Sequence, residues 1–196
     1  LTVAHNELVA RISLKDSVKE IREKEKKFKN AKKLLESGEL KKYEYSDGRY
    51  CIVSPGSIKD IYEEGIVLKH CIHTCDIYFQ RMDIRETYLL FLRRTDKPDV
   101  PWYTLEIEPG GNIRQKKSVL NEAYKDLDDA MPFLKKWQQW VKKNLSAKDK
   151  KLAEKSDKAR KDGYKQLREE KKLIWHGRLQ GTLLADALEN DFMEVV

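Results

Sequence analysis

The chain has 196 residues, enough for one ordinary domain with attachments or for two small domains. Its composition is 37% charged and 40% hydrophobic. No apolar run approaches the ~18 residues that a membrane span needs, so we expect no membrane partner. A net charge of +7 favours partners that carry phosphate groups, although many of the cations alternate with carboxylates along predicted helix faces.

The three cysteines form a small, odd-numbered set without the spacing of a disulfide framework. Disulfides persist in oxidising compartments, so this usage indicates a reducing, cytoplasmic location. The chain begins at Leu1 rather than at a methionine, as a piece of a longer protein would.

Charged and apolar residues divide the chain into three parts. Lys, Glu, Asp and Arg dominate residues 15–42 and 142–172, whereas most aromatic and β-branched side chains lie between these segments. We therefore predict a charged N-terminal helix at 1–40, a compact core domain at 41–145, and a lysine-rich helix or spacer with a C-terminal docking helix at 146–196.

The N-terminal part predicts one long helix. Apolar residues between Glu7 and Leu35 recur mostly at intervals of three, four or seven, which is the pattern of one helical face. Ser37 and Gly38 supply the end of the helix, because glycine suits a left-handed cap. A solvated helix that packs one stripe on the domain is the plainer interpretation, and an arm that grips nucleic acid or a partner is the alternative.

The core sequence predicts an α+β fold, in which a small, mostly antiparallel sheet of four or five strands is packed by helices and flanked by long charged helices. The β-prone runs lie at about 42–46, 49–53, 86–94, 101–108 and 112–118. Asp47 and Gly48 form a strong hairpin signal between the first two runs. Ser57 favours the start of a helix over 58–64.

The C-terminal third predicts two amphipathic helices separated by a polar segment. Large apolar residues between Tyr124 and Val141 share one helical face, with Trp137 among them. Residues 146–172 are rich in lysine and nearly free of large apolar groups, as in a solvated helix or a flexible spacer. Leucines around Leu184 then mark a short helix that must dock on another element.

The stretch VLKHCIHTCDIY, at 67–78, crowds two histidines and two cysteines into six residues. A structural zinc site usually draws two ligand pairs from separate segments, and the sequence offers no second pair, so we expect no metal here. A cysteine nucleophile with a histidine base is chemically possible, but adjacent helical residues point about 100° apart. Small buried hydrophobic side chains are an equally good interpretation of Cys71 and Cys75.

The segment LKHCIHTCDIYFQRMDIRETYLLFLRRTDKPDVPWYTLEIEPGGNIRQKKSVLN resembles the PcfJ-like protein family of bacterial conjugative plasmids, phages and other mobile elements. The family pattern combines a His-His-Cys-Val-Gly segment, a first strand that ends in Phe-Leu-Arg, a second strand that ends in Thr-Leu-Glu, and a Gln-x-x-Gly-x-x-Asn stretch before a C-terminal helix. The resemblance covers about residues 50–140. It implies a mobile-element context such as conjugation, with DNA transfer or processing as the associated activity, and it implies no particular reaction.

Position by position, the resemblance carries over to His70, Cys71, the triplet Thr104–Leu105–Glu106, Gln115 and Asn121. The chain departs from the family pattern at four positions, where it has Lys69, His73, Cys75 and Ser118. Because His73 and Cys75 fall outside the pattern, the resemblance removes two of the four candidate zinc ligands.

These matched positions leave a polar set that we name as candidate catalytic residues, namely His70, Cys71, Glu106, Gln115 and Asn121. Such a set is equally typical of a buried hydrogen-bond network that holds a small fold. Residues two apart share a strand face, so Thr104, Glu106 and Glu108 lie on one side of their strand. We expect the helix start at His70 to pack against this side, which brings His70 and Glu106 within hydrogen-bond or one-water reach. A carboxylate there would raise the pKa of the imidazole.

Three functions follow as hypotheses. The first is a nucleic-acid-associated protein that binds DNA or RNA through basic helices and through Arg93, Arg94, Arg114, Lys116 and Lys117. The second is a hydrolase or transferase acting on nucleic acid or nucleotide with the candidate catalytic residues. The third is a protein–protein adaptor that binds other mobile-element proteins through its long helices. None of the three requires a cofactor.

Overall fold

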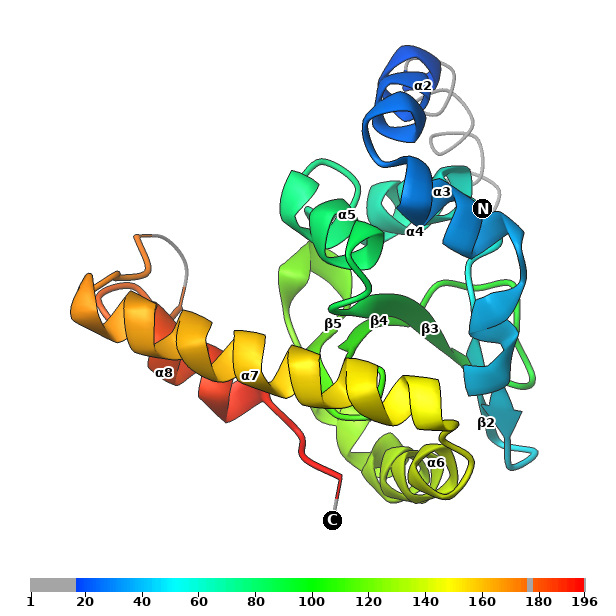
Figure 1. Cartoon of the computed structure of the whole chain (residues 1–196). Helices are drawn as coiled ribbons and strands as arrows, with labels where there is room; N and C mark the ends of the chain where they lie inside the picture. The colour runs from blue at the N-terminus through cyan, green and yellow to red at the C-terminus, as the bar shows by residue number, and fades with distance from the viewer. Residues whose placement is uncertain (1–16, 176–177, 196) are drawn as a thin grey trace.

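The computed structural model in Figure 1 describes residues 17–175 and 178–195. Within these ranges the chain forms an α+β fold with seven α-helices and one five-stranded antiparallel sheet. The strands follow one another across the sheet in chain order, as β1 (Tyr45–Ser46), β2 (Tyr50–Val53), β3 (Tyr88–Arg94), β4 (Tyr103–Ile107) and β5 (Ile113–Lys117). The predicted fold class is therefore confirmed.

The α-helices lie before β1, in the β2–β3 connection and after β5. Their bounds are α2 (Val18–Lys27), α3 (Lys29–Glu36), α4 (Ile58–Leu68), α5 (Asp76–Asp83), α6 (Met131–Lys143), α7 (Ala147–Glu169) and α8 (Leu184–Asp191). Three 3-10 turns complete the described structure, as η1 (Glu39–Tyr43), η2 (Val119–Asn121) and η3 (Lys125–Ala130).

The hairpin predicted at Asp47–Gly48 forms because the Asp47 side chain and the Gly48 backbone both suit a tight turn. The Asp47 carboxylate accepts hydrogen bonds from the backbone N–H groups of Arg49 and Tyr50 at 3.0 and 2.9 Å. Gly48 has a φ of 90°, which a side chain would strain. The predicted first strand is too long at its start, because residues 42 and 43 belong to η1, where the buried Tyr43 hydroxyl donates to the Pro109 carbonyl at 2.9 Å.

The single N-terminal helix predicted up to Leu35 is instead two helices in the described residues, with a break at Phe28. The Phe28 ring stacks on Phe79 of α5, at 5.8 Å between ring centroids. Beyond it, the Asp83 carboxylate at the end of α5 accepts from the backbone N–H groups of Asn30 and Ala31, at 2.8 and 2.9 Å. A side chain from α5 therefore caps the start of α3. The predicted part before residue 17 lies outside the described residues.

Helices cover both faces of the sheet (Figure 1). Helices α3, α4 and α5 lie over one face, and α6 lies over the other. On the α6 side, the buried Trp137 indole donates to the Tyr43 carbonyl at 2.8 Å, and the Phe133 ring lies 5.7 Å from the Tyr50 ring. Aromatic side chains of α6 thus pack against β2 and η1 on this side of the sheet.

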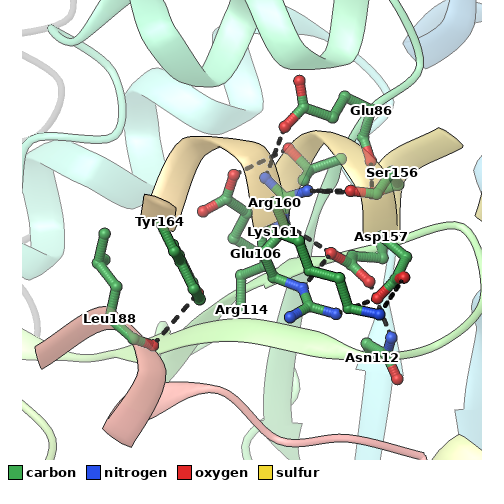
Figure 2. Close-up of polar contacts among 12 residues, drawn as sticks. Glu86, Glu106, Asn112, Arg114, Ser156, Asp157, Arg160, Lys161, Tyr164 and Leu188 are labelled. Carbon is green, nitrogen blue, oxygen red and sulfur yellow. Dashed lines mark hydrogen bonds and ion pairs between the residues drawn. The ribbon is translucent and has the colours of Figure 1, made fainter. Parts of the chain in front are cut away.

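Helix α7, which the sequence leaves open as a solvated helix or spacer, crosses the end of the sheet and is held there by a polar network (Figure 2). Glu108, which follows β4, accepts from Arg114 of β5 and from Arg160 of α7, both at 2.9 Å. Arg114 also donates to the carbonyl and the hydroxyl of Ser156, at 3.0 and 3.1 Å. All four side chains are buried, so α7 is tied to the core by paired charges.

Helix α8 completes this corner of the molecule. Its C-terminal extension pairs with the edge strand β5, because Met193 and Ile113 exchange backbone hydrogen bonds of 2.9 and 2.8 Å. The Phe192 ring lies 3.8 Å from the Arg160 guanidinium carbon, a cation–π contact. The docking expected for the last predicted helix therefore occurs on α7 and β5. The division of the chain at residues 40 and 145 stays a prediction.

We expect Glu108→Ala to lower the free energy of unfolding by about 3–5 kcal/mol, because it leaves Arg114 and Arg160 buried without the carboxylate that they share. Urea denaturation measures the change. The matched control is Glu169→Ala, which removes an exposed carboxylate of α7 that lies 3.9 Å from Lys165. It should change the same free energy by less than about 0.5 kcal/mol. Equal effects of the two substitutions would contradict the assigned role of Glu108.

Candidate functional site

Strand β4 presents two polar side chains, Thr104 and Glu106, on the sheet face that α4 and α5 cover. They are two residues apart and so share one side of the strand. Thr104 is 3% exposed and Glu106 is 2% exposed. Buried polar groups at this depth need hydrogen-bond partners, and those partners define two groups of side chains.

The first group joins His70 to Thr104 and Glu64. The Thr104 hydroxyl lies 3.1 Å from His70 Nε2 and donates to a Glu64 carboxylate oxygen at 3.2 Å. Because the hydroxyl proton goes to Glu64, the same oxygen accepts from His70, which assigns the proton of the imidazole to Nε2. Glu64 is also paired with the buried Arg93, through a 2.9 Å hydrogen bond and a second, shorter contact. Burial raises the pKa of Glu64, while Arg93 opposes the rise.

His70 is a neutral imidazole in the fold. Burial lowers its pKa to about 4. The expectation that a carboxylate partner raises this pKa is wrong, because the neighbour at Nε2 is a hydroxyl and the side chain is only 4% exposed. His70 Nδ1 is buried without a hydrogen-bond partner among the described residues.

The second group surrounds Glu106. One carboxylate oxygen accepts from Arg81 of α5 at 2.8 Å and from Thr87 at 2.9 Å. The other oxygen is buried and has no hydrogen-bond partner in the part of the chain that the structure describes. Gln115 lies directly opposite Glu106 on β5, and its amide oxygen is 3.4 Å from the Tyr78 hydroxyl. The sheet register therefore brings Glu106 and Gln115 together.

The predicted catalytic set does not form one constellation. His70 lies against the side of β4 that carries Glu106. Within the described ranges, however, the two side chains have separate partners and no hydrogen bond joins them. Cys71 is half-buried, and burial together with the neighbouring Cys75 thiol raises its pKa, which disfavours the thiolate that a nucleophile needs. Asn121 is exposed on η2 with a φ of 62°. Its catalytic role, like that of the other four, stays a prediction.

No three His, Cys, Asp or Glu side chains within 17–175 and 178–195 are grouped so that they could hold a metal ion. His73 instead packs against Tyr62 of α4, with 5.2 Å between the ring centroids. Across the same ranges, no helix is long and apolar enough to cross a membrane.

All five basic residues proposed for phosphate contacts take part in internal ion pairs, and four of them are less than about a third exposed. Arg93 pairs with Glu64, and Arg114 pairs with Glu86 and Glu108. Lys116 and Lys117 both approach the Asp191 carboxylate, at 3.4 and 2.9 Å. Arg94 differs, since its side chain is 46% exposed and lies 3.6 Å from Asp126.

The first hypothesis names basic helices without naming their lysines, and the structure gathers exposed lysines at the α6–α7 corner. These lysines, here called the lysine cluster, are Lys135, Lys136, Lys142, Lys143, Lys148, Lys150 and Lys151. The available signal was the near absence of acids, because Asp149 is the only Asp or Glu between residues 131 and 153. The alternation of cations and carboxylates further along α7 concealed this signal.

Asp149 does not neutralise the lysine cluster, because its side chain is turned inward. It is 4% exposed, its carboxylate accepts from the Ser146 hydroxyl at 2.6 Å in a capping box, and it pairs with Lys42 at 2.5 Å. Lys42 and Ser146 hold the pKa of Asp149 below its usual value against the effect of burial, so the charge is retained but buried.

Comparison with known proteins identifies the family. Residues 1–131 match a family model described as PcfJ-like protein, so the chain belongs to the PcfJ-like protein family. The match begins further upstream than the resemblance at 50–140 indicates, and it ends at the first residue of α6. Neither the curated proteins nor the solved structures gave a match.

The low pKa of His70 predicts a pH dependence of stability. Between pH 7 and pH 5 the unfolded chain protonates this imidazole while the folded chain does not. The free energy of unfolding should therefore fall by about 2 kcal/mol over this interval from His70 alone. Urea denaturation at both pH values measures the fall.

His70→Gln is the comparison variant, because it removes this titration while His73, whose pKa is also lowered by burial, keeps its own contribution. The variant should lose less stability than the unmodified protein between the two pH values. An identical loss in both proteins would show that His70 does not titrate as its burial requires.

Proposed function

We propose that this PcfJ-like protein binds nucleic acid, and that the lysine cluster at the α6–α7 corner contacts the phosphate backbone. The observation that supports the proposal is the concentration of exposed positive charge. Residues 131–169 contain thirteen Lys and Arg against five Asp and Glu, a net of +8, whereas the whole chain has a net of +7. Basic side chains clustered on one part of a surface are the electrostatic footprint of nucleic-acid binding.

The helical spacing supports this interpretation. Lys135 and Lys142 are seven residues apart in α6, as are Lys136 and Lys143, so each pair follows one side of the helix. The opposite side of α6 carries Trp137 and is buried in the core. An ordered helix that turns its lysines outward presents them without the entropy cost of ordering a flexible tail.

The alternative of a hydrolase or transferase receives less support. A reacting group must touch its substrate, yet His70, Thr104 and Glu106 are at most 4% exposed and hold one another and their neighbours in hydrogen bonds. The same contacts are those of a network that fixes α4 and α5 on the sheet. Among the residues that the structure describes, no specific contact favours the adaptor hypothesis.

The setting of this function is part of the proposal. Membership of the family favours a role in a bacterial mobile element, in the cytoplasm. DNA or RNA is the abundant polyanion there, and other proteins of the element are further partners. The lysine cluster lies beyond the residues that match the family model. We therefore propose that this chain uses a binding surface supplied by its own C-terminal helices.

Fluorescence anisotropy with labelled DNA and RNA tests the proposal. We expect binding at about 50 mM salt that weakens steeply by about 300 mM, because each neutralised phosphate releases counterions. Lys142→Glu/Lys151→Glu should weaken binding at least about tenfold. It should also reduce the slope of log affinity against log salt by about 2, since two cations no longer contact phosphate.

The matched control is Lys19→Glu/Lys59→Glu, which makes the same change of net charge at two exposed lysines of α2 and α4, outside the lysine cluster. It should weaken binding much less. Equal losses in the two double variants would reduce the effect to net charge alone, and absence of binding at about 50 mM salt would refute nucleic-acid binding.

A further inference from the structure

Two adjoining hollows open where the β1–β2 turn, the end of β3 and the start of β4 meet, and Arg94 lines both of them. The larger, of about 460 Å³, is also lined by Arg49, Tyr50 and Asp129. The smaller, of about 230 Å³, is also lined by Trp102. This surface is separate from the lysine cluster and from the buried groups on β4.

Planar side chains follow one another across these hollows. The Tyr50 and Trp102 rings are stacked, with 5.5 Å between centroids and an interplanar angle of 12°. The Arg49 guanidinium carbon lies 5.1 Å from the Tyr50 ring, and the Arg94 guanidinium carbon lies 4.5 Å from the Trp102 ring. The side chains of Arg49 and Arg94 are 71% and 46% exposed, so each ends the series with a planar group open to solvent.

The Asp126 carboxylate holds this arrangement in place. The Trp102 indole donates to one Asp126 oxygen at 2.8 Å, and the Tyr103 hydroxyl donates to the other at 2.7 Å. Arg94 lies 3.6 Å from the same carboxylate. Trp102 and Arg94 are therefore positioned before any ligand arrives, which reduces the entropy cost of binding.

The charge of the hollows differs from that of the lysine cluster. Three cations line them, namely Arg49, Arg94 and Lys97, and three carboxylates do so as well, namely Asp96, Asp126 and Asp129. Such balance does not favour a ligand that is mainly phosphate. It suits a flat, neutral group with hydrogen-bond donors, because exposed guanidinium planes stack on nucleobases and carboxylates accept from base amino groups.

Resting on the proposed nucleic-acid binding, we propose that the exposed guanidinium planes of Arg49 and Arg94, supported by the buried Tyr50 ring and by Trp102, form a site for an unpaired base that carries an amino group, so that the protein prefers single strands over duplex. Asp129, 3.9 Å from Arg49 and 73% exposed, is placed to accept from the amino group of adenine or cytosine. Helix α6 connects the two surfaces, because Phe133 contacts the Tyr50 ring at 5.7 Å and Lys135 and Lys136 follow within the next turn. One strand then supplies phosphates to the lysine cluster and a base to this site.

The test is Arg49→Lys/Arg94→Lys, which keeps both charges and removes both guanidinium planes. Anisotropy with adenine or cytosine single strands should show binding weakened by about tenfold, while affinity for duplex of the same length should be unchanged. Circular dichroism should give the melting curve of the unmodified protein, since both side chains are on the surface. In the unmodified protein, the same single strands should quench tryptophan fluorescence, and Trp102→Phe should remove most of that quenching.

The results separate the base site from the proposed nucleic-acid binding. Unchanged single-strand affinity in Arg49→Lys/Arg94→Lys would overturn the base site, while the effect of Lys142→Glu/Lys151→Glu would still support the lysine cluster. Equal weakening of single-strand and duplex binding would also overturn it, because loss of stacking on an unpaired base spares duplex. Absence of binding to any nucleic acid in the unmodified protein would overturn both proposals together.

Discussion

The pairing of buried carboxylates with arginines along β4 is the constraint on which the arrangement of the helices depends. Glu106 within the strand and Glu108 just after it are each 2% exposed or less. Arg81 of α5 forms an ion pair with Glu106, and Arg114 of β5 and Arg160 of α7 form ion pairs with Glu108. Buried ion pairs add little net stability compared with apolar packing, but an unpaired member is costly. The pairs therefore specify where α5 and α7 lie more than they strengthen the fold.

This constraint separates the part of the molecule that holds the fold from the part that meets solvent. The Thr-Leu-Glu triplet of β4 and His70 sit inside the fold, and their hydrogen bonds are made to one another or to nearby helices. By fixing α7 across the end of the sheet, the Glu108 pairs also fix which side of that helix faces outward. The exposed lysines of α6 and α7 consequently belong to a rigid surface, and it is this surface to which we assign binding.

The sequence was a good guide to local structure and a poor one to charge pairing. Alternation along the core strands predicted the sheet, because strand periodicity is local, whereas the register that pairs Glu106 with Gln115 comes from the structure. The helix break at Phe28 depends on Asp83, more than fifty residues away, and no local pattern contains it. In the same way, the sequence around Lys116 indicates a free cation, whereas the fold places Asp191 beside it. Ion pairs between distant segments are set by tertiary packing, so spacing alone does not reveal which charges remain free.

The most direct test of the account is acylation footprinting of lysines with and without bound nucleic acid, read by mass spectrometry. It reports on the amines themselves, in the unmodified protein. The account predicts that the seven amines between Lys135 and Lys151 lose reactivity when nucleic acid binds, while the exposed Lys59 and Lys125 keep theirs. Bound protein whose lysine cluster reacts as fast as in the free state would contradict the central claim that the α6–α7 corner is the binding surface.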